Sequence, residues 1–190
     1  MEIITLTEPK TKGKISFEEA IFKRKSHRKF TAENLSTDEI SQLLWAAYGR
    51  NKYGKVVPSA GAIYPYEIYI NLSDGIYKYE SDRHVILKVV DGDKSRGLYY
   101  AALHQDCVWD AKATIILAVN YEKIKARYGD RGIKYAHFEA GHIAQNICLQ
   151  AEALNLGSVC IGAYDEEKVA KIINLDENLK AIYMICIGKI

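Results

Sequence analysis

The segment from Gly132 to Asn155 most constrains the fold, because it can form a single long helix. It contains no proline, and apolar or small residues occupy positions 136, 140, 143, 144, 147, 151 and 154. This spacing is typical of a helix with one buried stripe, and Gly157 follows as a stop signal. Three small residues on the stripe would let a second helix approach closely: Ala136, Ala140 and Ala144.

Two serine–glutamate pairs predict where two shorter helices begin. Ser16 precedes Glu19 by three positions, and Ser36 precedes Glu39 by the same spacing, which is the capping-box pattern. The first pair predicts a short helix running toward residue 26, and the second predicts a helix over residues 37–48.

The remaining periodic segments predict a sheet with helices inserted between its strands. Residues 67–72, 75–79 and 85–90 read as an antiparallel meander. The other expected elements are a helix over 94–104, a strand over 114–120, a helix over 121–128, a strand over 158–162, a helix over 165–173 and a strand over 181–187. The sequence therefore predicts one α+β domain over residues 16–190, preceded by an N-terminal extension over 1–15.

The distribution of charge and the spacing of the cysteines limit which binding partners and which cellular compartment are expected. The 26 basic and 24 acidic residues are interspersed and leave a net charge of +2, which favours neither nucleic acid nor a membrane surface as a partner. The start lacks the charged and apolar regions of a secretory signal, so a cytoplasmic protein is expected. Four widely spaced cysteines without a C-x-x-C pair predict free thiols, mostly buried: Cys107, Cys148, Cys160 and Cys186.

A run of small residues lies between two prolines, Pro58-Ser59-Ala60-Gly61-Ala62-Ile63-Tyr64-Pro65. The prolines restrict the backbone, and the small residues leave N–H groups accessible with little side-chain bulk. A flat ligand could lie against such a tract. The alternative is an ordinary surface loop that leads into the next strand.

Two further tracts could contact a ligand. Arg24-Lys25-Ser26-His27-Arg28-Lys29 combines guanidinium groups with a hydroxyl, which suits a phosphate, although a solvated helix end would look similar. The predicted strand over 158–162 ends in Gly162-Ala163, whose backbone could approach a ligand closely. A plain helix–strand connection is the alternative there.

Other catalytic signatures are absent from the sequence. His137 and His142 are five positions apart around Glu139, so they diverge on a helix and predict no metal site. Neither G-x-G-x-x-G after a strand nor a P-loop occurs, which excludes those nucleotide-binding motifs.

In order along the chain, these segments resemble the nitroreductase superfamily of flavoproteins, and specifically its SagB-type dehydrogenase branch. The matching elements are residues 24–30, 58–65, 128–132 with 139–146, and 156–165. The resemblance implies a nitroreductase-like fold, with a central, mainly antiparallel sheet flanked by helices. It also implies a homodimer with the long central helix at the interface and FMN sites shared between subunits.

The resemblance further implies a set of cofactor residues. Arg24 would face the FMN phosphate, and Arg28 the ribityl chain and the N1/O2 edge of the ring, where a guanidinium stabilises charge on reduction. Lys189 is the sole candidate for a basic residue that completes the phosphate site near the C-terminus. The other implied contacts are Ser26, the partner's Pro58, Ser59, Ala60 and Gly61, and Gly162 and Ala163 beside the ring.

The implied activity is ping-pong hydride transfer from NAD(P)H through flavin N5 to a small acceptor such as a quinone or nitroaromatic. One alternative is a SagB-type azoline dehydrogenase, and another is a flavin-binding module without turnover. Tyr64 is the nearest candidate for a proton donor, and a packed loop aromatic is the competing interpretation of this residue.

Overall fold

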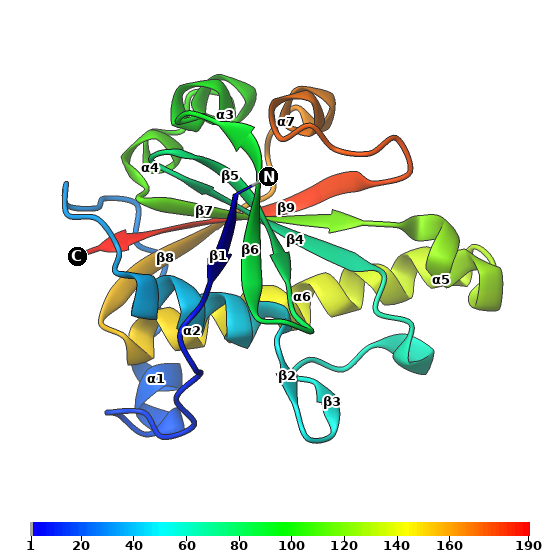
Figure 1. Cartoon of the computed structure of the whole chain (residues 1–190), viewed down its shortest axis with the longest axis horizontal. Coiled ribbons are helices and arrows are strands. Elements are labelled where there is room, and N and C mark those ends of the chain that lie inside the picture. Colours follow the sequence, from blue (N-terminus) through cyan, green and yellow to red (C-terminus); the bar gives the residue numbers. More distant parts are fainter. Residues whose placement is uncertain (1) are drawn as a thin grey trace.

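The computed structural model describes residues 2–190 as a seven-stranded sheet with helices on both faces (Figure 1). The strand order is β1-β6-β5-β4-β7-β9-β8, and every neighbouring pair is antiparallel. The predicted α+β fold with a mainly antiparallel sheet is confirmed. The strands are β1 (Ile3–Thr5), β4 (Tyr66–Leu72), β5 (Gly75–Glu80), β6 (Val85–Asp91), β7 (Ala113–Val119), β8 (Leu156–Ile161) and β9 (Lys180–Lys189), with a separate β2 (Arg50–Asn51) and β3 (Gly54–Lys55) hairpin.

Helices enclose two apolar cores, one on each face of the sheet. Helices α1, α2 and α6 cover one face, and α3, α4 and α7 cover the other (Figure 1). Strand β7 is buried along its whole length because it contributes to both cores. The helices are α1 (Phe17–Lys23), α2 (Thr37–Tyr48), α3 (Ser95–Ala101), α4 (Asp106–Asp110), α5 (Tyr121–Tyr128), α6 (Arg131–Ala153) and α7 (Glu166–Ile172), with a 3-10 turn η1 (Ala60–Ala62).

The long helix predicted from the apolar spacing is α6. Its small-residue stripe is buried within the chain, where α6 packs against α2. The expected close approach of a second helix is therefore met by α2 of the same subunit. The stripe comprises Ala136, Ala140 and Ala144, none more than 5% exposed.

The two serine–glutamate pairs begin helices as expected, but only one forms a complete capping box. The Ser36 and Glu39 side chains each accept a hydrogen bond from the other residue's backbone N–H. Ser16 caps α1 in the same way, whereas Glu19 instead forms an ion pair with Lys23 at 2.6 Å. Helix α1 ends there, three residues before the expected limit.

One expected helix is interrupted, and one strand lies where an extension was expected. The segment 94–104 forms α3 only as far as residue 101, because Leu103 and His104 adopt left-handed φ angles of 57° and 60°. The chain then turns into α4. Near the N-terminus, Ile3–Thr5 pairs with β6 as the edge strand of the sheet.

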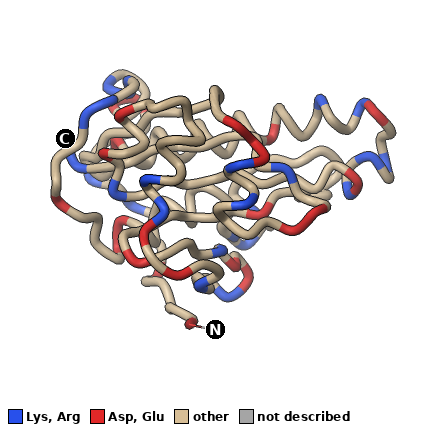
Figure 2. The backbone as a smooth tube through the Cα atoms, turned by 90° about the horizontal axis from the view of Figure 1, so that it is seen from above, with Lys and Arg blue, Asp and Glu red and all other residues tan. Residues whose placement is uncertain are grey.

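Basic and acidic residues are interspersed along the chain and form no large patch of a single charge (Figure 2). Surface ion pairs between nearby residues, such as Arg83 with Glu80, reflect this mixing. Within residues 2–190, no helix combines the length and the hydropathy needed to cross a bilayer.

Candidate functional site

The arginine-rich segment does not continue α1 but runs extended beside strand β8. Ser26 forms a parallel bridge with Ser158, and the His27 backbone N–H donates to the Ser158 carbonyl at 3.0 Å. Further on, the Thr31 N–H donates to the Lys189 carbonyl at 2.9 Å. The backbone of residues 26–31 is therefore fixed to β8 and to the end of β9 at single points.

Extended geometry sorts the side chains of this segment into two sets. His27 turns toward α6, where its Nε2 lies 3.5 Å from Glu152 Oε1, and the Lys25 N–H also points to that oxygen at 3.3 Å. Ser26 and Arg28 are exposed, and Arg24 is half-buried. Among the described residues, neither guanidinium forms a hydrogen bond or an ion pair, so both remain available to an anion.

Two glycines make room for this segment. Gly157 on β8 and Gly188 on β9 are opposite each other in the strand register. A Cβ at Gly157 would lie 2.8 Å from His27 Cβ, and one at Gly188 would lie 2.7 Å from both Cβ and Cγ of Phe30. Such distances exclude any side chain without displacement of the neighbouring backbone. The glycine pair thus provides the flat surface on which the arginine-bearing segment rests.

Lys189, the expected second phosphate contact, is engaged by carboxylates. Its Nζ lies 2.8 Å from Glu39 Oε1 and 3.4 Å from Glu33 Oε1, and these contacts, the Glu39 hydrogen bond first, raise the pKa of Lys189. Burial opposes the effect at Glu39, but Lys189 and Ser36 together hold the pKa of that carboxyl below its usual value. Lys189 is thus close to the segment, and its role toward a phosphate stays a prediction.

The end of β8 presents open backbone, as the small residues predicted. Gly162 and Ala163 are exposed, and a Cβ built at Gly162 meets nothing within 4 Å. The Gln105 side-chain amide donates to the Ala163 carbonyl at 2.9 Å and to the Ala102 carbonyl at 3.0 Å, which ties this end to the α3–α4 turn. No sequence motif had marked Gln105, because its partner is 58 positions away.

The proline-bounded tract forms a tightly turned loop around η1. Ala62 and Tyr64 have positive φ angles of 53° and 51°, and Gly61 has a φ of 60°. The Ser59 hydroxyl accepts the Tyr64 N–H at 2.9 Å and so closes the turn. The outer part of the loop is exposed at Pro58 and Gly61, so its backbone can meet another molecule.

Helix α5 supports this loop with two side chains, Arg127 and Tyr128, for which the sequence had predicted no contact with the loop. A Cβ at Gly61 would lie 2.7 Å from Tyr128 Oη and 2.9 Å from Arg127 Nη1, and Arg127 donates to the Gly61 carbonyl at 3.3 Å. Bulk at Gly61 therefore collides first with α5. The Tyr64 ring packs edge-on against Tyr48 with centroids 6.1 Å apart, consistent with a packed aromatic, and its role as a proton donor stays a prediction.

The expected cofactor residues fall into two groups that one subunit does not bring together. The arginine-bearing segment contacts α6 at Glu152, and the proline-bounded loop lies near Glu139 of the same helix. These two positions are separated by roughly 20 Å along the helix at about 1.5 Å per residue. The first group also includes the open end of β8. Within one chain, the two groups therefore do not form a single site.

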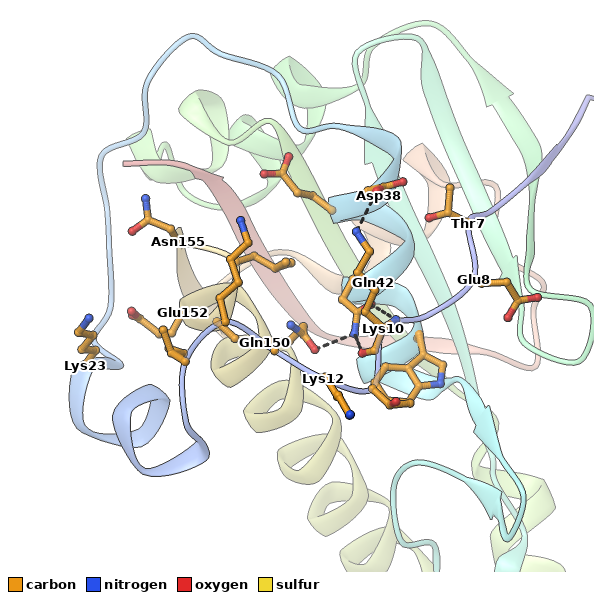
Figure 3. Close-up of a pocket in the computed structure, with 18 residues that line it drawn as sticks. Thr7, Glu8, Lys10, Lys12, Lys23, Asp38, Gln42, Gln150, Glu152 and Asn155 are labelled. Atoms are coloured by element: carbon orange, nitrogen blue, oxygen red, sulfur yellow. Dashed lines mark hydrogen bonds and ion pairs between the residues drawn. The ribbon is translucent and has the colours of Figure 1, made fainter.

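A cavity of about 560 Å³ lies elsewhere, between the N-terminal segment, α2 and the end of α6 (Figure 3). The Gln42 side chain spans this cavity. Its Oε1 accepts a hydrogen bond from the Lys10 N–H, and its Nε2 donates to the Lys10 carbonyl and, at 3.1 Å, to Gln150 Oε1. None of its 18 lining residues belongs to the expected cofactor set. Within the described residues, the four cysteines are free, and no cluster of three potential metal ligands occurs.

Comparison with known sequences identifies relatives over most of the chain. The nitroreductase family model matches residues 21–189. The nitroreductase-family protein MJ1384 of Methanocaldococcus jannaschii is 42% identical over 171 residues, which is 86% of each chain. The microcin B17-processing protein McbC of Escherichia coli is 28% identical over 161 residues, and the match spans 77% of this chain but only 59% of McbC.

Solved structures share the fold. A nitroreductase-family crystal structure from Ralstonia eutropha superposes with a TM-score of 0.87 at 25% identity, over 98% of this chain and 89% of that one. A family structure from Desulfovibrio desulfuricans in complex with FMN gives a TM-score of 0.69 at 22% identity, over 92% and 86% of the two chains. With the family model spanning residues 21–189, the chain belongs to the nitroreductase family.

Proposed function

We propose that the protein binds FMN and transfers reducing equivalents from NAD(P)H to a small acceptor such as a quinone or a nitroaromatic. When bound, FMN supplies the redox chemistry, accepting hydride at N5 and passing it on in a ping-pong cycle. The chain's own residues bind and orient the cofactor and tune its electrostatics. The observation that carries the proposal is a pair of guanidinium groups, Arg24 and Arg28, that have no ion-pair or hydrogen-bond partner within residues 2–190 and that lie on a segment beside the exposed end of β8.

Each part of the site has a distinct task. Arg24 binds the phosphate, with Ser26 as a hydroxyl donor beside it, because guanidinium and hydroxyl groups suit phosphate oxygens. Arg28 stabilises the negative charge that develops at the N1/O2 edge on reduction. The exposed backbone at Gly162 and Ala163 lies where the ring can approach without a side chain in the way.

A homodimer completes the site in this proposal. The proline-bounded loop of one subunit would reach the flavin held by the arginine-bearing segment of the other, because a single chain keeps these groups apart. Apolar side chains that are unusually exposed on α1 and α6 support an interface on that side of the molecule. They are Phe17, Ile21, Phe22, Ile133 and Phe138, of which Phe22 is 90% exposed.

Flavin content and turnover test the proposal. The purified protein is expected to show the absorbance of bound FMN and to oxidise NADH or NADPH when a quinone is present. Arg24→Glu should lose FMN while keeping the fold, since repulsion replaces a charge-assisted contact worth about 1.5 to 3 kcal/mol. Arg83→Glu, a charge reversal on a remote turn, serves as the control. A protein that neither contains nor takes up FMN would refute the proposal.

The similarity to McbC favours a second candidate, FMN-dependent oxidation of an azoline heterocycle. In that reaction the substrate, rather than a nicotinamide, would supply the hydride, and oxygen would reoxidise the flavin. Anaerobic mixing with NADPH and, separately, with an azoline-containing peptide distinguishes the two by which of them bleaches the flavin. Flavin that neither donor reduces would indicate a binding module without turnover.

A further inference from the structure

Two cysteine thiols are in contact where α6 packs against β8 (Figure 1). The Sγ of Cys148 on α6 lies 3.7 Å from the Sγ of Cys160 on β8, and both thiols are free. Cys148 is 6% exposed, whereas Cys160 is half-buried and gives the pair a route to solvent. The two sulfur atoms are therefore placed to react with each other once one of them is oxidised.

Cys148 lies on the helix that holds one side of the arginine-bearing segment, residues 24–30. Glu152 follows Cys148 by about one helical turn and is 8% exposed at its side chain. Its Oε1 accepts the Lys25 N–H at 3.3 Å and lies 3.5 Å from His27 Nε2. A movement of this turn of α6 is therefore transmitted to the segment.

Cys160 lies on the strand that holds the other side of the segment. Ser158 precedes Cys160 by two positions, so both side chains lie on the same face of β8. The backbone of Ser158 forms a bridge with Ser26, and its carbonyl accepts the His27 N–H at 3.0 Å. His27 is thus bound both to the helix of Cys148 and to the strand of Cys160.

The contact between the thiols also favours their oxidation. The hydrogen bond with Cys160, and to a smaller extent the Arg24 charge, lowers the pKa of Cys148 to about 7 against the opposing effect of burial. The same hydrogen bond raises the pKa of Cys160. Near neutral pH the pair therefore holds one thiolate beside one thiol, and the thiolate is the form that reacts with peroxides.

We propose that Cys148 and Cys160 form a redox site that hydrogen peroxide converts to a disulfide, and that this conversion weakens the contacts of the arginine-bearing segment. The thiolate of the pair attacks one peroxide oxygen and breaks the O–O bond, which gives a sulfenic acid and hydroxide. The remaining thiol attacks the sulfenic sulfur and displaces its hydroxyl group as water. The hydroxide takes up the proton that the first thiol had released, so two thiols and one peroxide give one disulfide and two waters.

Disulfide formation changes the spacing of α6 and β8 beside the segment. The two sulfur atoms must move from 3.7 Å to about 2.05 Å apart. Because His27 is bound to both elements, it cannot keep both contacts unchanged, and the displaced backbone carries Arg24 and Arg28 with it. The disulfide and the movement of His27 rest on the structure of one subunit. The effect on FMN rests on the proposed function, in which reoxidation of flavin by oxygen would also supply peroxide.

The test treats the parent, Cys160→Ala, Cys148→Ala and the control Cys107→Ala with hydrogen peroxide. Cys107 is a suitable control because it is also buried, at 5% exposed, but belongs to the core on the other face of the sheet. Mass spectrometry of the alkylated, unreduced digest should show a peptide pair joined through Cys148 and Cys160 in the parent and in Cys107→Ala. Neither of the other two variants can form this pair.

Two further quantities report the effect on the segment. They are the protection factor of the His27 amide against hydrogen exchange and the dissociation constant of FMN. In the oxidised parent and the oxidised Cys107→Ala, His27 protection should fall about tenfold, and the dissociation constant should rise at least about tenfold, as expected when one charge-assisted contact is disturbed. Dithiothreitol should restore both values. Peroxide-treated Cys160→Ala should keep the values of its untreated form.

The absence of the Cys148–Cys160 peptide pair after peroxide treatment would overturn the redox site. A disulfide that leaves His27 protection unchanged, or an equal loss of protection in treated Cys160→Ala, would overturn the coupling to the segment. If Cys160→Ala does not fold, Cys148→Ala provides the same comparison. If the parent binds no FMN, the proposed function fails, and the peptide mapping and exchange data still decide the role of the thiol pair.

Discussion

Gly188→Ala tests whether the glycine pair positions the arginine-bearing segment. The added Cβ would lie 2.7 Å from Phe30 Cβ and Cγ and 2.9 Å from its Cδ1, about 1 Å inside normal carbon–carbon contact. Phe30 Cβ is bonded to the main chain, so a change of rotamer cannot clear it. The backbone near Phe30 must move, together with the hydrogen bond from Thr31 to the Lys189 carbonyl.

The expected cost is that of overpacking, about 1 to 3 kcal/mol of unfolding free energy. For a chain of this size, each kcal/mol lowers the melting temperature by about 2 to 4 °C. Displacement of Phe30 also moves Arg28, two residues away, and loss of its charge-assisted contact would weaken FMN binding by about 10-fold to 150-fold. Denaturant unfolding and FMN titration measure the two effects. Gly13→Ala is the control, because its Cβ meets only Ile15 O at an ordinary 3.5 Å.

A double-mutant cycle isolates the steric cause. In a Phe30→Gly background both the clashing Cβ and the ring are gone, so Gly188→Ala should add far less destabilisation than it does in the parent. Equal destabilisation in both backgrounds would refute the collision with Phe30. If Gly188→Ala lowers stability but leaves FMN affinity unchanged, the glycine pair does not position the arginine-bearing segment for flavin binding.

Three further perturbations follow from the structure. Gly61→Val should lower FMN affinity and NADH-driven quinone reduction, because a β-branched side chain at a φ of 60° would collide with Tyr128. The circular dichroism spectrum should stay unchanged. Unchanged FMN affinity and activity would contradict the role of the loop. Glu39→Gln should flatten the acid limb of stability: the lowered pKa of Glu39 stabilises the fold above the unfolded value near 4.5, and this contribution is lost as pH falls through the folded pKa. Acid unfolding curves that coincide with the parent would disprove it. Phe138→Glu places a charge on an exposed apolar position of α6. Light scattering should then show monomers in place of a dimer, with loss of bound FMN. A dimer that persists would locate the interface elsewhere.

Local patterns in the sequence were sufficient for most of the secondary structure. The apolar spacing of α6 and the Ser36–Glu39 pair act within a few residues, so helix periodicity and capping predict them without tertiary information. The end of the helix predicted over residues 94–104 was harder to predict. It is interrupted at Leu103 and His104, which adopt left-handed φ angles where the chain contacts the distant end of β8.

The site itself was only partly determined by the sequence. Small residues and arginines marked the tracts that could touch a ligand, and the resemblance to flavoproteins suggested which ligand. Their placement depended on partners far along the chain: Ser26 lies beside Ser158, and Gly157 faces Gly188. Such contacts leave no periodic signal, because they join strands and loops that only the complete sheet brings together.

The sequence by itself determined the α+β class, the long helix and the motifs of a flavin-binding family, because propensity, periodicity and turn chemistry are local. Only the tertiary structure decided that Glu139 is buried beneath the proline-bounded loop, and that this loop and the arginine-bearing segment contact positions roughly 20 Å apart on α6. Burial and separation depend on how all the layers pack, so neither could be predicted from any one segment.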